Sequence, residues 1–199
     1  AMFNAWQPGV FALSGWDLSG MLTLERSKVA RLLASGDTRW IHRAAYDLMD
    51  FQPEATESPS KMPRGTSLYG SLPEQLQDPN SFASRLREVL AVRTRYRVST
   101  SVQVDVPDVP DRAMLVMVHL LDTGQLQVTV LNFSSRSIAG RVKSEHLAPG
   151  AAVIDLCTDQ VIAEVDPEQT FAVSLEPHQG MALLTVPVDV SGPPSRSPR

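Results

Sequence analysis

The chain has 199 residues, of which 43% are hydrophobic, and carries a formal net charge of −4 at pH 7. This length allows one large domain or two small ones, and the acidic balance argues against a surface for nucleic acid or anionic membranes. Because we see no leader segment and no apolar run of the roughly 20 residues that span a bilayer, we expect a soluble, cytoplasmic protein.

The first predicted element is a buried strand at residues 10–13, which follow a Pro-Gly turn and include no polar residue. Such a run is typical of a strand covered on both faces of a parallel sheet. Trp16 and Asp17 come directly after it, at the strand end where α/β barrels build their active sites. For Asp17, local capping or pairing is the alternative. Since a lone parallel strand forms no sheet, we expect a truncated chain that begins inside an element whose partners are missing.

Helices and a long loop are predicted next. Apolar residues at helical spacing predict a helix over residues 24–35 and a shorter one over residues 40–49. The Pro-, Ser- and Thr-rich residues 52–67 predict a long surface loop, either a functional excursion or a mobile segment. Asp78 and Pro79 then open a helix with an apolar stripe. We interpret its five arginines as a solvated face, with a phosphate-binding face as the alternative. They are Arg85, Arg87, Arg93, Arg95 and Arg97.

Beyond residue 97 the sequence changes to short β-rich runs separated by turn signals, so the chain divides there into an α/β piece and an all-β domain. The predicted strands lie at residues 98–106, 114–121, 126–133, 138–143, 153–156, 171–175 and 181–186. Seven short strands with intervening turns predict an antiparallel β-sandwich. The Pro- and Ser-rich residues 187–199 predict a disordered tail.

The residue pattern identifies no catalytic, metal or cofactor site. The four histidines, His42, His119, His146 and His178, are scattered without metal-ligand spacing. Residues 65–70 superficially look like a nucleophile elbow but lack the glycine two places after the serine, so a turn is the better interpretation. The single cysteine, Cys157, excludes an internal disulfide, and we interpret it as a structural thiol.

Seven collinear segments carry a resemblance to a known family. They are MFNAWQPGVFALSGWDL at residues 2–18, GDTRWI at 36–41, AYDL at 45–48, LYGSLPEQL at 68–76, SFAS at 81–84, LVMVH at 115–119 and VLNF at 130–133. The chain resembles trehalose synthases of the type found in pseudomonads, which are maltose α-D-glucosyltransferases of the α-amylase superfamily of glycoside hydrolases. The first segment is similar to the last barrel strand of these enzymes, and the resemblance covers residues 2–186.

This resemblance implies the carboxyl-terminal end of a (β/α)8 barrel, with its last strand and helices, followed by an antiparallel β-sandwich domain. Residues 1–97 are then the end of the catalytic barrel with the long loop 52–67, and residues 98–186 are the sandwich. The implied reaction is isomerisation of maltose to trehalose by a retaining double displacement, with an aspartate nucleophile, a glutamate acid/base and a second aspartate. None of these three carboxylates has a matching position here.

We therefore expect no catalytic residue, no metal and no cofactor in the chain, and no activity from it alone. Trp16 and Asp17 are expected to bind substrate in the full-length enzyme. The expected partners are maltose and trehalose, the missing barrel strands of the same polypeptide, and further copies in a homo-oligomer. Two alternatives stay open, namely a stand-alone carbohydrate-binding module built on the sandwich and a structural or interaction module.

Overall fold

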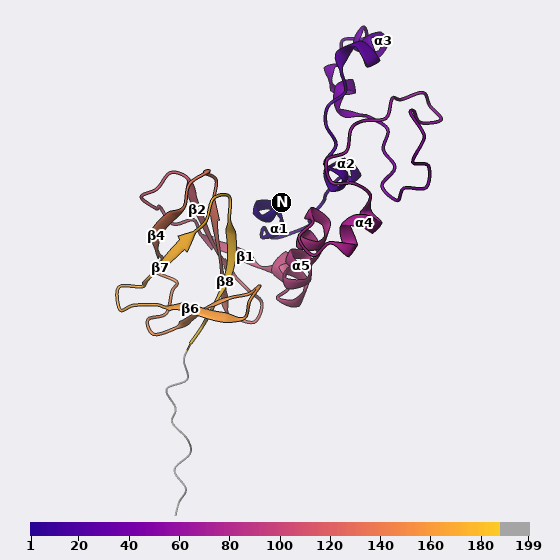
Figure 1. The fold of residues 1–199 in the computed structure, drawn as a ribbon. Helices are drawn as coiled ribbons and strands as arrows, with labels where there is room; N and C mark the ends of the chain where they lie inside the picture. The colour runs from indigo at the N-terminus through magenta and orange to yellow at the C-terminus, as the bar shows by residue number, and fades with distance from the viewer. Residues whose placement is uncertain (188–199) are drawn as a thin grey trace, which may run out of the picture. The chain divides into compact units, whose positions relative to one another are not determined.

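A computed structural model describes residues 1–187, and the chain divides into two compact units (Figure 1). The β unit combines residues 1–11 with the residues from Val89 onward, and the helical unit consists of residues 12–88. The two units divide inside helix α5 (Phe82–Arg95), whereas the sequence changes to short β-rich runs only near residue 97. The predicted disordered tail lies, from residue 188 onward, outside the described residues. Within residues 1–187, no helix combines the length and apolarity needed to cross a bilayer.

The β unit is built on antiparallel sheets. Its strands are β1 (Val102–Asp105), β2 (Met114–Leu120), β3 (Leu126–Asn132), β4 (Ile138–Lys143), β5 (Ala152–Asp155), β6 (Gln160–Glu164), β7 (Thr170–Leu175) and β8 (Gly180–Val186). Six of them pair in the order β1-β2-β3-β8-β5-β6, and β4 pairs with β7 in a second sheet. The expectation of a β-rich antiparallel domain is confirmed, and β6 has no counterpart among the predicted strands.

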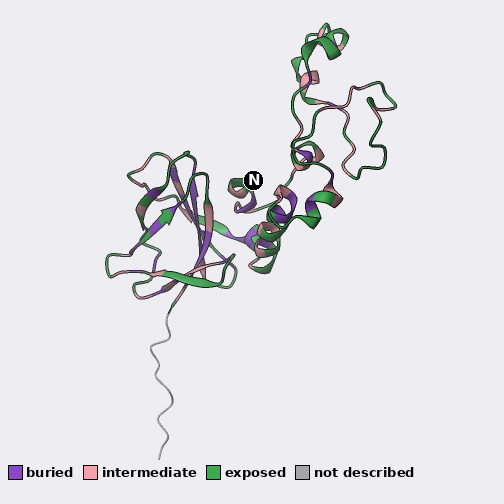
Figure 2. Ribbon diagram, in the orientation of Figure 1, coloured by how far each residue is buried: buried purple, intermediate pink, exposed green. Residues whose placement is uncertain are grey.

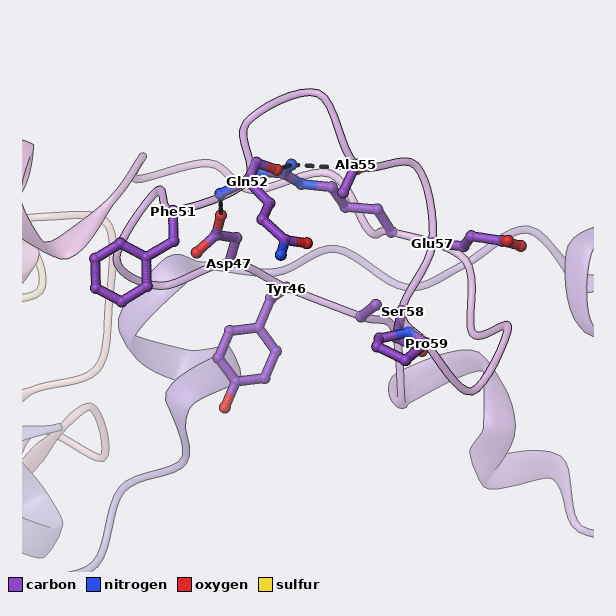
Figure 3. A pocket seen from close by; sticks show the side chains of 10 residues that line it. Tyr46, Asp47, Phe51, Gln52, Ala55, Glu57, Ser58 and Pro59 are labelled. Atoms are coloured by element: carbon purple, nitrogen blue, oxygen red, sulfur yellow. Dashed lines mark hydrogen bonds between the residues drawn. The ribbon is translucent and has the colours of Figure 1, made fainter.

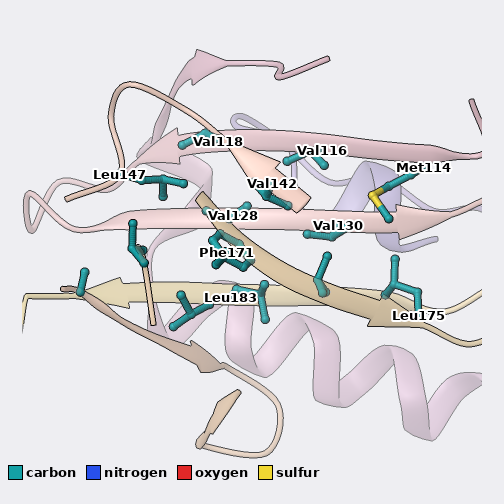
Figure 4. Packing of buried hydrophobic residues seen from close by; sticks show 14 of the residues in the cluster. Met114, Val116, Val118, Val128, Val130, Val142, Leu147, Phe171, Leu175 and Leu183 are labelled. Carbon is teal, nitrogen blue, oxygen red and sulfur yellow. The ribbon is translucent and has the colours of Figure 1, made fainter. Parts of the chain in front are cut away.

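The core of the β unit lies between the two sheets. Side chains along a strand alternate between its faces, so every second residue turns inward. Val116 of β2, Val130 of β3, Val142 of β4 and Phe171 of β7 are buried together in one cluster (Figure 4). Burying a side chain of this size fully stabilises the folded state by roughly 1.5–3 kcal/mol relative to leaving it exposed.

The opposite face of the six-stranded sheet is covered by the start of the chain and by the second half of α5. Trp6, which follows helix α1 (Met2–Ala5), is fully buried there against Ala182 and Leu184 of β8. Val89 and Val92 of α5 pack against the same cluster. Both faces of the central strands of the large sheet are therefore shielded from water, whereas the edge strands β1 and β6 stay exposed or half-buried.

Arg93 ties these two covering segments together. Its side chain, on α5, is only 7% exposed. The guanidinium donates from Nη1 to the carbonyl oxygens of Ala5 and Gln7, at 2.5 and 2.6 Å, and from Nη2 to the carbonyl oxygen of Gly9. A buried cation is tolerated only where its donors find acceptors, and the carbonyls of residues 5, 7 and 9 supply them here.

The helical unit contains short elements around a small core. They are α2 (Gly15–Ser19), the 3₁₀ segment η1 (Arg26–Val29), α3 (Ala30–Leu33), the 3₁₀ segment η2 (Thr38–His42), α4 (Leu72–Gln77) and the start of α5. The buried hydrophobic cluster of this unit comprises Leu24, Val29 and Ala44, and Figure 2 shows most of its segments exposed or half-buried. A further 3₁₀ turn, η3 (Val98–Thr100), belongs to the β unit.

Several local predictions for residues 1–88 were wrong. The predicted strand at residues 10–13 is absent, because no strand in the described part of the chain pairs with it, and Val10 is 95% exposed. The predicted helix 24–35 is reduced to η1 and α3. The predicted helix 40–49 is also absent. Its first residues belong to η2, and Ala45 then forms an isolated β-bridge with Arg64 of the loop. Backbone pairing with a distant segment overrides helical periodicity at this place.

We predict that Arg93→Met lowers the free energy of unfolding of the β unit by about 2–4 kcal/mol, because three backbone carbonyls lose a charged donor. Urea denaturation followed by circular dichroism measures this. Arg87→Met, an exposed position on the same helix, is the control and is expected to change stability by less than about 0.5 kcal/mol. Equal stability of the two variants would contradict the assigned role of Arg93.

A buried histidine makes the β unit sensitive to acid. His119 of β2 is fully buried, and its Nδ1 lies 3.1 Å from Oε1 of Gln127, whose amide donates to the hydroxyl of Thr129 at 2.7 Å. Since Oε1 only accepts, Nδ1 carries the proton. Nε2 has no partner among the described residues, and burial lowers the pKa of His119.

Because the folded state holds this pKa below its unfolded value of about 6.5, the unfolded chain binds more protons at acidic pH. Stability is therefore predicted to fall as pH drops below about 6.5. His119→Leu should flatten this dependence, whereas His146→Leu, at an exposed position, should leave it unchanged. The measurement is the slope of unfolding free energy against pH, and an unchanged slope in His119→Leu would refute the assignment.

Candidate functional site

Trp16, the first residue singled out by the sequence, lies on α2 beside a second aromatic ring. Its indole Nε1 donates to the carbonyl oxygen of Ala44 at 2.9 Å. Its ring meets that of Tyr46 edge to face, with 6.0 Å between centroids and an interplanar angle of 65°. Both rings keep accessible surface, 36% for Trp16 and 43% for Tyr46. The pair is an exposed aromatic surface whose orientation is fixed by a backbone hydrogen bond.

Asp17, the second predicted residue, caps its own helix. Oδ2 accepts from the backbone N–H of Ser14 at 3.3 Å and from its hydroxyl at 2.7 Å, while the hydroxyl of Ser14 accepts from the N–H of Asp17. This capping box satisfies donors that the first turn leaves free, and the acid suits the positive end of the helix. The structure thus assigns Asp17 the local capping role, and a contact with substrate stays a prediction.

Tyr46 also lines a pocket of about 260 Å³ in the helical unit (Figure 3). Its walls come from residues 45–47, from the loop 51–59 and from Arg64. Phe51, which is 81% exposed, and Tyr46 contribute aromatic rings, and Asp47, Gln52 and Glu57 contribute polar groups. Aromatic faces combined with side-chain acceptors suit ligands that present both C–H faces and hydroxyls.

The polar wall of this pocket is held by two anchoring residues. Asp47 accepts from the backbone N–H of Gln52 at 2.5 Å through Oδ2. Arg64 donates through Nη1 to the carbonyl oxygens of Gln52, Pro53 and Ala55, at 2.9, 2.7 and 3.2 Å. Both residues therefore hold the backbone of residues 52–55, although the loop contains no helix or strand.

These contacts also set the charge of the pocket. The Gln52 N–H lowers the pKa of Asp47, against an opposing effect of burial, and the Arg64 charge acts in the same direction as the hydrogen bond. Asp47 is consequently ionised at neutral pH and is an acceptor rather than a proton donor. Glu57 forms an ion pair with Lys61. The pocket is accordingly suited to binding, since neither carboxylate is placed as a general acid.

A second pocket of about 190 Å³ shares Tyr46, Asp47 and Arg64 with the first. Ser71 and Glu74 line its other side and form a capping box at the start of α4. The N–H and hydroxyl of Ser71 lower the pKa of Glu74. The shared wall makes Tyr46 and Asp47 the centre of the candidate site.

The other residues considered from the sequence do not assemble into a site. The arginines on and just after α5 make separate contacts. Arg93 binds backbone carbonyls, whereas Arg85 and Arg95 of α5 and Arg97 beyond it pair with Glu88, Asp159 and Asp122. The elbow-like Ser67 donates to the carbonyl oxygen of Ser19 at 2.5 Å. Across residues 1–187, no group of three or more His, Cys, Asp or Glu residues is arranged to hold a metal ion.

Sequence reasoning missed Tyr46, Asp47 and Arg64. The first two were placed on a predicted helix, and Arg64 in an unstructured loop. The available signal was the length of the loop 52–67, because loops of this size inside a compact unit are often functional.

No family model matches the sequence, and no curated protein matches it. Glycoside hydrolases are among the solved structures that are similar to the chain. An α-amylase from Geobacillus thermoleovorans complexed with acarbose is 11% identical, with a TM-score of 0.49 over 65% of this chain and 26% of that one. An Anoxybacillus α-amylase is 10% identical, with a TM-score of 0.42 over 56% and 24%. A GH27 β-L-arabinopyranosidase from Geobacillus stearothermophilus is 19% identical, with a TM-score of 0.41 over 53% and 24%. The chain thus spans about a quarter of each of these proteins.

Arg64→Gln is predicted to loosen the pocket wall without unfolding the unit. Loss of the three guanidinium contacts should raise the amide exchange rate across residues 52–57 by about tenfold, because the free energy of local opening falls. Hydrogen–deuterium exchange with mass spectrometry measures this. Arg43→Gln, which removes an exposed pairing with Asp37, is the matched control. Identical exchange of the loop in both variants would show that Arg64 does not hold it.

Proposed function

We propose that the chain supplies the carboxyl-terminal part of a trehalose synthase, an enzyme that isomerises maltose to trehalose by intramolecular glucosyl transfer. Two findings support the proposal. The collinear sequence resemblance covers residues 2–186, and the antiparallel β unit agrees with the carboxyl-terminal sandwich that the resemblance implies. On this proposal, the sandwich supports the catalytic barrel and the helical unit borders the sugar pocket.

The proposed sugar binding rests on the ring of Trp16, which is half-exposed, fixed by a hydrogen bond and in contact with Tyr46. Aromatic rings stack on the C–H faces of a pyranose, and the ionised Asp47 accepts hydrogen bonds from hydroxyls. Residues 10–13 lead directly into α2. In the full-length enzyme this segment is proposed to become the last barrel strand, once neighbouring strands pair with its free backbone groups.

The proposal assigns the catalytic carboxylates to other strands of the barrel. A retaining double displacement needs a nucleophile and an acid/base about 5–5.5 Å apart across the glycosidic bond. Asp17 caps a helix, Asp47 binds the loop and Glu57 pairs with Lys61. We therefore propose that the chain contributes substrate contacts and structural support. Its proposed partners are maltose and the remaining barrel. We further propose that the enzyme works in the cytoplasm and forms a homo-oligomer.

The experiment has two arms. The purified 199-residue chain is predicted to produce neither trehalose nor glucose from maltose, as followed by chromatography against a heat-inactivated control. In the polypeptide that includes the preceding barrel, Trp16→Ala should lower kcat/KM for maltose by about fivefold to tenfold, because the stacking surface is lost. Trp16→Phe, which retains a ring, should lose less.

Either of two results would count against the proposal. Turnover of maltose by the chain alone would show that it holds its own catalytic groups. An unchanged kcat/KM in Trp16→Ala, with unchanged thermal stability, would remove Trp16 from the substrate site.

A further inference from the structure

A third, larger pocket of the helical unit has a different chemistry from the Tyr46 site. It encloses about 670 Å³ between η1 with α3 on one side and residues 60–63 on the other. Three cationic side chains line it, namely Lys28, Arg31 and Lys61, and none of its lining residues is acidic. The charged residues of the lining are all cationic, which favours an anionic ligand, and Glu57 outside the lining pairs with Lys61.

The two cations of the helical side are available for a ligand. Lys28 of η1 and Arg31 of α3 both line the pocket. Among the described residues neither forms an ion pair, whereas Arg39 and Arg43 of the same unit both pair with Asp37. Two hydroxyls, those of Ser27 and Ser60, add neutral donors to the same lining.

The third cation, Lys61, lies in a tight turn of the backbone. Lys61 has a φ of +64°, a left-handed conformation that glycine or asparagine adopts more easily. The turn is closed by Lys61 N–H to the carbonyl oxygen of Ser58 at 2.9 Å and by Ser58 N–H to that of Met62 at 2.8 Å. The ion pair of Lys61 with Glu57 is exposed and weak enough for a stronger anion to displace.

The rest of the lining indicates what the anion is attached to. Trp40, Leu32 and Met62 give the pocket an aromatic and apolar part. The volume is within the range of small-molecule sites and much larger than a bare phosphate needs. We propose that this pocket binds a phosphate monoester of a sugar-sized molecule, with the phosphate at Lys28, Arg31 and Lys61 and the organic body against Trp40. The inference is independent of the proposed function, because it concerns different residues and a different ligand.

The test is titration of the ¹⁵N-labelled 199-residue chain with glucose 1-phosphate at constant ionic strength. The readouts are the Trp40 indole N–H and the backbone amides of Lys28, Arg31 and Lys61 in NMR spectra. Inorganic phosphate and maltose are the comparison ligands. Saturable shifts confined to these residues, with glucose 1-phosphate bound more tightly than inorganic phosphate and no shift there with maltose, are expected.

Three variants sharpen the result. Lys28→Gln with Arg31→Gln should weaken binding by at least about tenfold, since two charged donors are lost. Arg26→Gln, an exposed cation of η1 outside the lining, is the matched control and should bind like the parent. Lys61→Gly relieves the left-handed backbone, so it should weaken binding while thermal stability stays the same or rises.

The proposal is overturned if glucose 1-phosphate does not saturate below about 10 mM, a limit that corresponds to negligible affinity. Equal affinity for inorganic phosphate would also overturn it, since the organic body would then contribute nothing. Parental affinity in Lys61→Gly would exclude Lys61 from the site and overturn the proposed lining. Equal losses in Arg26→Gln and the double variant would show that a general charge effect rather than this pocket attracts the anion.

Discussion

A six-stranded sheet has two faces to keep from water, and in this protein the second sheet covers only one of them. The other face is covered by Trp6 from the start of the chain and by the apolar side of α5. Arg93 of α5 joins these two segments, because its buried guanidinium donates hydrogen bonds to the carbonyl oxygens of Ala5, Gln7 and Gly9. The burial of His119, whose neighbours Val116 and Val118 face the other way into the core between the sheets, depends on this cover.

The strands of the β unit were predictable because their signal is local. Alternating apolar residues and turn residues such as Gly124 mark β2 and β3 almost to the residue. The short helices α2 and α4 were missed, although Ser14 with Asp17 and Ser71 with Glu74 have the spacing of a capping box. Burial of both faces was inferred for residues 10–13 from apolarity alone, and apolarity does not say whether a pairing strand is present.

The candidate site was only partly predictable, because its geometry depends on pairs that are distant in sequence. Trp16 was identified from its position after an apolar run, yet its neighbour Tyr46 lies 30 residues further on, and periodicity placed Tyr46 on a helix. Arg64 orders its loop through carbonyl oxygens, which carry no signature in a sequence. Side chains that bind backbone are therefore the class of contact that pattern analysis misses most readily.

The pairing of Trp6 with β8 has a consequence for synthesis on the ribosome. Residues 1–11 are synthesised before the strand against which Trp6 packs, which ends at Val186. At translation rates of about 5–20 residues per second, that delay is on the order of ten seconds or more. Throughout this interval a large aromatic side chain and the growing edge of an incomplete sheet stay solvated. The β unit therefore closes only after a segment about 180 residues downstream of Trp6 has been made.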